Sequence, residues 1–266
     1  MFPFEYIKPK SLKEAKTNFD QADDAVYLAG GMTIIATMKQ RLTQPSHVID
    51  LSNIKGLGVI DFSNGYIKIG AMASHAEVAE SNIVNSEIPA LSSLASNIGD
   101  PQVRVRGTLG GSISNADPSA DYPAALLALD ARINTMERQI KADDLFKGLF
   151  ETALEDGELV KSVSFKKPLK ASYKKFSNPA SRYAIVGVFV AEFEDYVRVG
   201  VTGAGVNAFR WVEAEEVLIK NLNPLSLDQI SLPIDDLNED IHASKHYRAS
   251  LVKTMLKRAV GEILKK

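Results

Sequence analysis

The sequence predicts an α+β protein made of several small lobes, and three patterns carry this prediction. A strand, a glycine turn, a helix and a second strand follow one another in the first fifty residues. An Asn-Gly dipeptide then joins two alternating apolar runs, which is typical of a β-hairpin. Two apolar strands followed by helical patterns occupy the last third. We expect boundaries between residues 1–56, 57–175 and 176–266.

The first lobe is predicted to be a parallel βαβ unit. Ser11 is a plausible N-cap for a helix over residues 12–18, with Glu14 in the capping-box position. Strands are expected at residues 25–28 and 47–51, with a helix over residues 33–41 between them. A helix that connects two strands of one sheet makes those strands parallel.

The second lobe is predicted to begin with a hairpin and to contain a long functional loop. The hairpin joins residues 58–62 to residues 66–70, and helices are expected at residues 74–81, 89–97, 124–130 and from residue 143. Residues 99–123 are rich in Gly, Ser, Asn, Asp and Pro and show no periodicity. Such a loop inside a compact domain is usually functional, so we expect a ligand there.

The last lobe is predicted to contain two strands and two helices. A lysine-rich stretch with Pro168, residues 166–175, is a candidate junction before it. The strands are expected at residues 183–193 and 196–202, and a helix at residues 211–220. Residues 247–264 have the apolar spacing of a packed amphipathic helix.

Composition and charge exclude several classes of protein. The 266 residues include 31 Lys plus Arg and 33 Asp plus Glu, a net charge of −2 that does not fit a nucleic-acid binder. No apolar run resembles a signal peptide or reaches the roughly 20 residues of a membrane helix, so a cytoplasmic protein is expected. With no cysteine, the chain cannot hold an iron–sulfur cluster or a zinc ion through its own thiolates.

Two glycine pairs predict a diphosphate site. Gly30-Gly31 is followed by Thr33, and Gly110-Gly111 is followed by Ser112. Glycines let backbone N–H groups approach a phosphate closely, and the hydroxyls can donate to it. Two tight turns without a ligand are the alternative. The spacings of a Rossmann fingerprint and of a P-loop are both absent, so neither of those nucleotide sites is expected.

Isolated histidines and arginines give weaker indications. His242 and His246 are four residues apart and could bind a metal on a helix, but no third ligand is near, which favours a solvated face. His47 and His75 have no recognisable catalytic partner. Arg104 and Arg106 either face the long loop or are ordinary surface charges.

Three segments together resemble the FAD-binding medium subunit of molybdenum hydroxylases, the family of aerobic carbon monoxide dehydrogenase and xanthine dehydrogenase. They are AGGMT at residues 29–33, the run IGDPQVRVRGTLGGSISNADPSADYPAALLALDA at residues 98–131, and the stretches 143–148 and 157–160 continued by residues 173–187. The resemblance covers nearly the whole chain. It implies a two-lobed FAD-binding domain of the vanillyl-alcohol oxidase or PCMH type, followed by a C-terminal α+β domain with a small antiparallel sheet and helices.

The resemblance also implies a set of residues that hold FAD. The first glycine pair and Thr33 would bind the pyrophosphate, residues 108–112 would form a second wall, and Ile98 would touch the cofactor through its backbone. Serine replaces the usual family asparagine at Ser112, which removes an amide contact. The implied cofactor-binding residues are Ala29, Gly30, Gly31, Met32, Thr33, Ile98, Thr108, Leu109, Gly110, Gly111, Ser112, Asp121, Leu159, Val160, Lys175 and Tyr183.

Five of these residues have implied roles at the two ends of the cofactor. Asp121 would accept hydrogen bonds from the adenosine end, although an Asp before an apolar helix is more often a helix cap. Leu159 and Val160 would line the flavin ring, with Tyr183 beside the isoalloxazine face, although Tyr183 could also be part of the core. Lys175 would lie near the flavin.

The function implied is that of an electron-transfer flavoprotein subunit. A large partner subunit with molybdopterin would oxidise the substrate, a small one would relay electrons through 2Fe-2S clusters, and FAD on this chain would pass them to NAD or a quinone. No catalytic residue or metal ligand is expected here, because the flavin carries the chemistry. The alternatives are a stand-alone FAD-dependent oxidase or reductase, for which no general base is evident, and a cofactor-free interaction protein.

Overall fold

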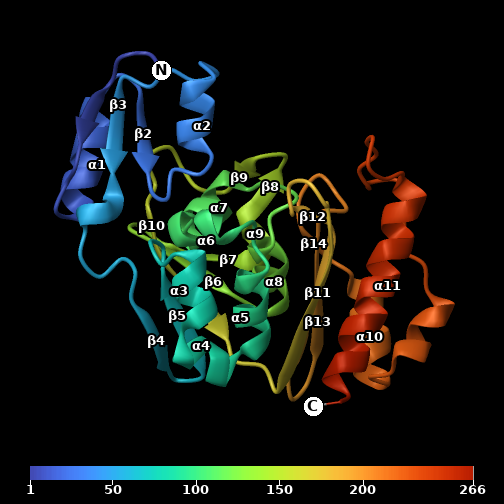
Figure 1. The fold of residues 1–266 in the computed structure, drawn as a ribbon. Coiled ribbons are helices and arrows are strands. Elements are labelled where there is room, and N and C mark those ends of the chain that lie inside the picture. Colours follow the sequence, from blue (N-terminus) through green and yellow to red (C-terminus); the bar gives the residue numbers. More distant parts are fainter. Residues whose placement is uncertain (266) are drawn as a thin grey trace.

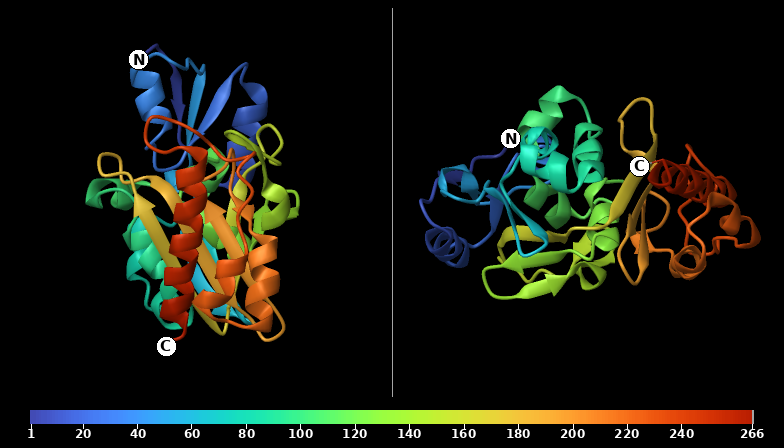
Figure 2. Two further views of the ribbon diagram at one scale, coloured as in Figure 1. Left: turned by 90° about the vertical axis from the view of Figure 1, so that its right-hand side faces the viewer. Right: turned by 90° about the horizontal axis from the view of Figure 1, so that it is seen from below.

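The computed structural model describes residues 1–265 and arranges them around three main sheets. Figure 1 shows the N-terminal part above and beside a central block of helices and strands, with a third sheet against that block. Helices α10 (Val212–Lys220) and α11 (Lys245–Ile263) cover the outer face of the third sheet, as Figure 2 shows from the side. None of the helices in residues 1–265 combines the length and the apolar character needed to cross a membrane.

The N-terminal sheet is parallel, as predicted. Its strands are β1 (Glu5–Ile7), β3 (His47–Asp50) and β2 (Ala25–Leu28), in that order, with helices α1 (Leu12–Gln21) and α2 (Ile34–Lys39) and the short turn η1 (Leu51–Asn53). The Ser11 hydroxyl accepts a hydrogen bond from the Glu14 N–H and caps α1. The Glu14 carboxylate accepts from the N–H of Lys10 rather than that of Ser11, so the capping box is only half formed.

The central sheet is antiparallel and contains the predicted hairpin. Its strands, in spatial order, are β4 (Ile60–Ser63), β5 (Tyr66–Gly70), β10 (Val160–Lys166), β6 (Arg132–Thr135) and β7 (Gln139–Lys141). Asn64 and Gly65 have φ of 51° and 77°, as a two-residue hairpin turn of this kind requires. Helix α4 (Asn82–Glu87) packs on strands β4 and β5 of this sheet, α3 (His75–Glu80) and α5 (Pro89–Ser96) pack against α4, and α8 (Tyr122–Ala128) packs against the C-terminal sheet.

The expectation of an unstructured loop over residues 99–123 is wrong. Two helices, α6 (Pro101–Arg106) and α7 (Leu109–Asn115), occupy most of it. The Asp100 carboxylate caps α6 by accepting from the Val103 N–H at 2.8 Å, and Pro101 takes the first helical position. Helices of six and seven residues make fewer than two full turns, which is too short for an apolar period to show in the sequence.

The C-terminal sheet is antiparallel, with strands β11 (Lys170–Ser177), β12 (Ala184–Glu192), β13 (Val197–Thr202) and β14 (Phe209–Arg210). The predicted junction at residues 166–175 is largely strand, because β10 ends and β11 begins on either side of Pro168. The remaining elements are α9 (Ala142–Leu145), β8 (Phe146–Gly148), β9 (Glu151–Thr152) and η2 (Pro224–Gln229). The domain boundaries at residues 56 and 175 stay a prediction.

Buried side chains form three apolar clusters that fix the sheets against one another. The largest lies between the central sheet and the inner face of the C-terminal sheet and includes Tyr122, Phe165 and Phe189. A second, with Trp211, fills the space under α10 and α11, and a third lies beneath the N-terminal sheet. Each large apolar side chain that is fully buried contributes about 1.5–3 kcal/mol. The N-terminal and central sheets are therefore held firmly enough to form the two sides of a cleft.

Candidate cofactor site

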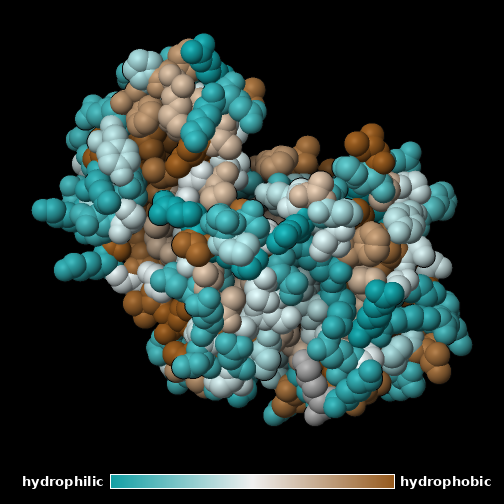
Figure 3. All heavy atoms as spheres, viewed as in Figure 1, coloured by the Kyte–Doolittle hydropathy of each residue, from teal (hydrophilic) through white to brown (hydrophobic). Residues whose placement is uncertain are grey.

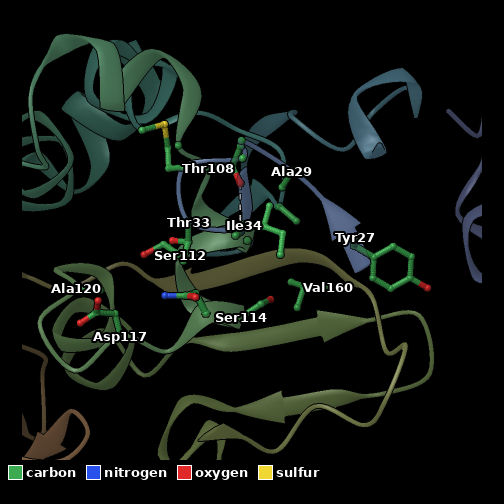
Figure 4. A pocket seen from close by; sticks show the side chains of 18 of the residues that line it. Tyr27, Ala29, Thr33, Ile34, Thr108, Ser112, Ser114, Asp117, Ala120 and Val160 are labelled. Carbon is green, nitrogen blue, oxygen red and sulfur yellow. Dashed lines mark hydrogen bonds between the residues drawn. The ribbon is translucent and has the colours of Figure 1, made fainter. Parts of the chain in front are cut away.

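A cavity of about 740 Å³ lies between the N-terminal sheet and the rest of the chain. The molecular surface is notched at this place (Figure 3). The lining comes from the end of β2, the loop before α2, the start of α7, the loop before α8, the start of β10 and the loop before β12. This volume is in the range of small-molecule and cofactor sites, and the close-up of Figure 4 shows how its side chains face one another.

The first glycine loop presents unpaired backbone donors. Within residues 1–265, the N–H groups of residues 30–34 donate to no protein acceptor. Gly31 has φ +77°, a conformation that other residues rarely adopt. A Cβ on Gly30 would overlap the carbonyl oxygen of Arg106, so the two glycine-rich segments are in direct backbone contact. Donors without protein partners beside a cavity are suited to an anionic ligand.

The second glycine loop faces the first, but its amides are already used. The N–H groups of Leu109 and Gly110 donate to carbonyls of the segment after β5, at 3.0 and 2.8 Å. The Thr108 hydroxyl accepts from the Gly111 N–H at 3.1 Å and so caps α7. A Cβ on Gly111 would lie 3.6 Å from that of Ala29. This wall therefore contributes a closely packed surface and the side chain of Ser112, rather than free amides of residues 109–111. The Ser112 side chain lies next to that of Thr33 in Figure 4.

Asp121 is a buried carboxylate with two protein donors. Lys175 Nζ donates to it at 2.9 Å and the Tyr173 hydroxyl also donates to it. The side chains of Lys175 and Asp121 are 5% and 4% exposed. Burial raises the pKa of Asp121, and the neighbouring Lys175 partly opposes this. The carboxylate makes no capping bond to α8, so the helix-cap alternative is wrong.

The contact between Asp121 and Lys175 bears on which end of the cavity holds which part of a ligand. The family resemblance implies the adenosine end for Asp121 and the flavin for Lys175, but residues bonded to one another lie at the same end. In Figure 4, Val160 lies near Tyr27, and Asp117 lies beyond Thr33 and Ser112 on the opposite side.

Tyr183 belongs to the Asp121 end of the cavity. It is 45% exposed and lines the cavity, so the interpretation as core is wrong. The charges of Asp117 and Asp121 both act on its hydroxyl. Asp117, Ser181 and Tyr183 also line a second, polar cavity of about 240 Å³ that adjoins the first. The end with Tyr183 therefore opens onto a second hydrophilic space.

The other end is enclosed by the N-terminal sheet. Leu159 is buried in the third apolar cluster, and the Tyr27 hydroxyl donates to the Gly157 carbonyl at 3.2 Å. Glu158 accepts from the Arg138 guanidinium at 2.9 and 3.0 Å, which lowers its pKa to about 2. This ion pair fixes the turn that leads into β10.

Most of the predicted site residues do line the cavity. They are Ala29, Gly30, Gly31, Met32, Thr33, Ile98, Thr108, Gly110, Gly111, Ser112, Asp121, Leu159, Val160 and Tyr183. Leu109 is fully buried and Lys175 contributes only through Asp121. Arg104 faces the loop and donates to the carbonyls of Ile98 and Gly99, both at 3.1 Å. Contact of each residue with a cofactor stays a prediction.

Other lining residues were missed. His75, Tyr27, Asp117 and Arg182 all line the cavity, and of these only the lone His75 offered any chemical signal in the sequence. His242 and His246 are exposed. In the described part of the chain, no group of three or more acidic or imidazole side chains is placed to hold a metal ion.

The shape and the donors of the cavity fit FAD. Unpaired amides and small residues lie in the middle, where a diphosphate would be held, and aromatic side chains lie toward both ends. A dinucleotide needs such an arrangement because its charged centre separates two ring systems. A single nucleotide would leave one of the two ends unfilled.

Comparison with known proteins agrees with this fit. Residues 2–167 match the family described as the FAD binding domain in molybdopterin dehydrogenase. The chain is 34% identical to the glyceraldehyde dehydrogenase medium chain of Sulfolobus acidocaldarius, over 99% of this chain and 100% of that one. It is 32% identical to the nicotine 6-hydroxylase medium subunit of Paenarthrobacter nicotinovorans, over 97% and 96% of the two chains.

Solved structures agree as well. A Cu,Mo-containing CO dehydrogenase superposes with a TM-score of 0.89 at 30% identity, over 99% of both chains. Quinoline 2-oxidoreductase from Pseudomonas putida 86 gives 0.90 at 27% identity, over 100% of this chain and 98% of that one. The predicted α+β fold of the PCMH type is confirmed. The chain therefore belongs to the family of FAD-binding medium subunits of the molybdenum hydroxylases.

Proposed function

We propose that this chain is the FAD-binding electron-transfer subunit of a molybdenum-containing hydroxylase complex, and that FAD spans the 740 Å³ cavity with its diphosphate at the first glycine loop. The observation that carries the proposal is the row of unpaired N–H groups at residues 30–34, which faces a second glycine loop across the cavity. Backbone donors fixed by the fold bind a phosphate without any ordering of side chains.

The flavin ring belongs at the end with Tyr183, and the adenosine at the end with Tyr27, Leu159 and Val160. A redox ring has to be reached by an electron donor and an acceptor, and Tyr183 is half exposed beside the second cavity. Lys175 and Asp121 lie at that same end and supply fixed charge near the ring. This assignment moves Leu159 and Val160 to the adenosine and Asp121 to the flavin, relative to what the family resemblance implies.

Electrons reach this chain from clusters on another polypeptide. The chain has no cysteine, so a partner must hold the 2Fe-2S clusters, and a large subunit with molybdopterin must oxidise the substrate. When bound, FAD accepts electrons one at a time and delivers them in pairs. The residues of this chain bind and orient the cofactor, and the acceptor, NAD or a quinone, approaches at the Tyr183 end. We place the complex in the cytoplasm.

The proposal is tested with the purified chain and then with the native complex. The isolated chain should take up one equivalent of FAD and turn yellow, and substrate should reduce that flavin only when the molybdenum and iron–sulfur subunits are present. A chain that takes up no FAD would contradict flavin binding. Rapid reduction of the flavin by a small substrate without partners would instead support a stand-alone oxidase or reductase.

A further inference from the structure

His75 lies against the second glycine loop, on the wall of the cavity. It is the first residue of α3, and its N–H donates to the Gly107 carbonyl at 2.9 Å. The imidazole packs on the same glycine, because a Cβ on Gly107 would lie 2.5 Å from Nε2. The side chain is 95% enclosed by protein, with a relative exposure of 5%. Backbone and ring together hold this histidine in one orientation.

Two enclosed polar atoms without partners belong to neighbouring rings here. Among the described residues, His75 Nδ1 and the Tyr122 hydroxyl are both buried and make no hydrogen bond. The two rings have centroids 5.4 Å apart. His75 Nε2 has no protein partner either, but it is not enclosed and reaches the cavity. Buried polar groups are almost always paired, so two neighbouring exceptions beside a cavity need an explanation.

Both groups are uncharged near neutral pH. Burial and the nearby Arg104 lower the pKa of His75 to about 4, so the imidazole is neutral. Burial raises the pKa of Tyr122, which keeps its hydroxyl protonated. A neutral imidazole has one N–H and one lone pair, and the hydrogen bond at one nitrogen decides which nitrogen carries the proton.

We propose that His75 carries its proton on Nε2, because the enclosed Nδ1 has no acceptor in reach, and that Nε2 donates to an oxygen of the FAD diphosphate. The proposal rests on FAD occupying the cavity. The Nε2–H group would supply the hydrogen-bond donor that the second wall lacks, because the N–H groups of Leu109, Gly110 and Gly111 are used within the protein. With the free amides of residues 30–34 opposite, the diphosphate would have donors on both sides.

The test uses the full chain and four variants, with binding of FAD and of ADP measured by titration. ADP carries the diphosphate without the flavin. His75→Leu should weaken binding of both ligands by about tenfold or more, as expected for the loss of a hydrogen bond to a charged group. His75→Gln should bind within about threefold of the unaltered chain, since its amide nitrogen can occupy the position of Nε2. Tyr122→Phe, which removes a hydroxyl without a partner and keeps the neighbouring ring, and His246→Leu, at an exposed position, should change the binding of neither ligand.

A second measurement reads the tautomer directly. In ¹⁵N NMR spectra of the unaltered chain with FAD bound, His75 should carry its proton on Nε2, and Tyr122→Phe should leave the proton there. A proton on Nδ1 in the unaltered chain overturns the proposal, even if His75→Leu fails to fold. Equal binding by His75→Leu, or a loss for FAD without one for ADP, also overturns it. If the unaltered chain binds no FAD at all, it is the proposed function that has failed.

Discussion

Replacing Lys175 with methionine removes the cation bonded to Asp121 and leaves a buried carboxylate with the Tyr173 hydroxyl as its remaining donor. Breaking a buried ion pair on one side costs about 3–5 kcal/mol. Because the hydrogen bond from Tyr173 survives, we expect Lys175→Met to lower the free energy of unfolding by about 3 kcal/mol at pH 7, the lower end of this range. In urea, with an m value of about 3 kcal/mol/M for a chain of this size, the midpoint should fall by about 1 M.

The loss should depend on pH in a defined direction. Burial already raises the pKa of Asp121 in the folded state, and removing Lys175 raises it further. In this variant the folded protein binds the proton of Asp121 more tightly than the unfolded chain does. The free energy of unfolding therefore falls as the pH rises from the unfolded pKa of 3.8 through the folded pKa. The cost of Lys175→Met should therefore be complete at pH 7 and clearly smaller at pH 5.

Two further variants test whether the ion pair between Asp121 and Lys175 is the source of this cost. Asp121→Asn removes the charge that Lys175 neutralises, so the double variant should be less destabilised than the sum of the two single variants. Lys174→Met is the matched control, because its side chain is 37% exposed and pairs with Glu262, and it should cost less than about 1 kcal/mol. The reasoning is refuted if Lys175→Met costs no more than Lys174→Met, or if its cost is the same at pH 5 and pH 7.

Three other substitutions test the walls of the cavity and the support behind them. Gly30→Ala should abolish measurable FAD binding in a titration, because its Cβ overlaps the Arg106 carbonyl, whereas Gly58→Ala, with nothing closer than 3.8 Å, should not. Glu158→Gln should cost on the order of 2 kcal/mol at pH 7 in urea unfolding. That cost should vanish as pH falls from 4.5 toward about 2, since the folded pKa lies below the unfolded one. Arg248→Met should cost about 3–5 kcal/mol by the same assay, because the buried guanidinium donates to the carbonyls of Ile185 and Gly203 and pairs with Asp240.

Each of these three has a result that would contradict it. Full FAD affinity in Gly30→Ala would mean that the two glycine segments can separate without harm to the site. A Glu158→Gln cost that persists at pH 2 would mean that the ion pair with Arg138 is not its source. A Tm and urea midpoint unchanged by Arg248→Met would mean that water replaces the guanidinium as the donor to the carbonyls of Ile185 and Gly203.

The elements that the sequence predicts well are those specified by neighbouring residues. The Asn64-Gly65 turn needs positive φ at both positions, and these two residue types tolerate it best, so the hairpin follows from a dipeptide. The unit β2–α2–β3 follows in the same way from its glycine turn and its alternating character. Both glycine loops of the site can be predicted for the same reason, because adjacent glycine and hydroxyl residues are enough to indicate a phosphate-binding loop.

The elements that were missed depend on partners distant in sequence or are too short to show a period. Helix α6 has a local signal in Asp100-Pro101, a cap followed by proline at the first helical position, but it is too short to show an apolar period. The bond between Asp121 and Lys175 joins residues 54 positions apart, so no local pattern could place the two at one end of the cavity. His75 gave only a lone histidine in the sequence, and its importance comes from its place against Gly107 on the wall of the cavity.

Strand β10 is the last of its sheet in sequence and the middle one in space. On the ribosome, the β4–β5 hairpin is complete long before the strand that joins it to the β6–β7 hairpin has been made. About ninety residues separate β5 from β10, on the order of 10 s of synthesis. During that interval the β4–β5 hairpin has an open edge on which a second chain can pair, and from Lys141 onward the β6–β7 hairpin has one as well. A truncated product that ends before residue 160 keeps those edges permanently and is expected to aggregate, whereas the longer chain closes the sheet with β10.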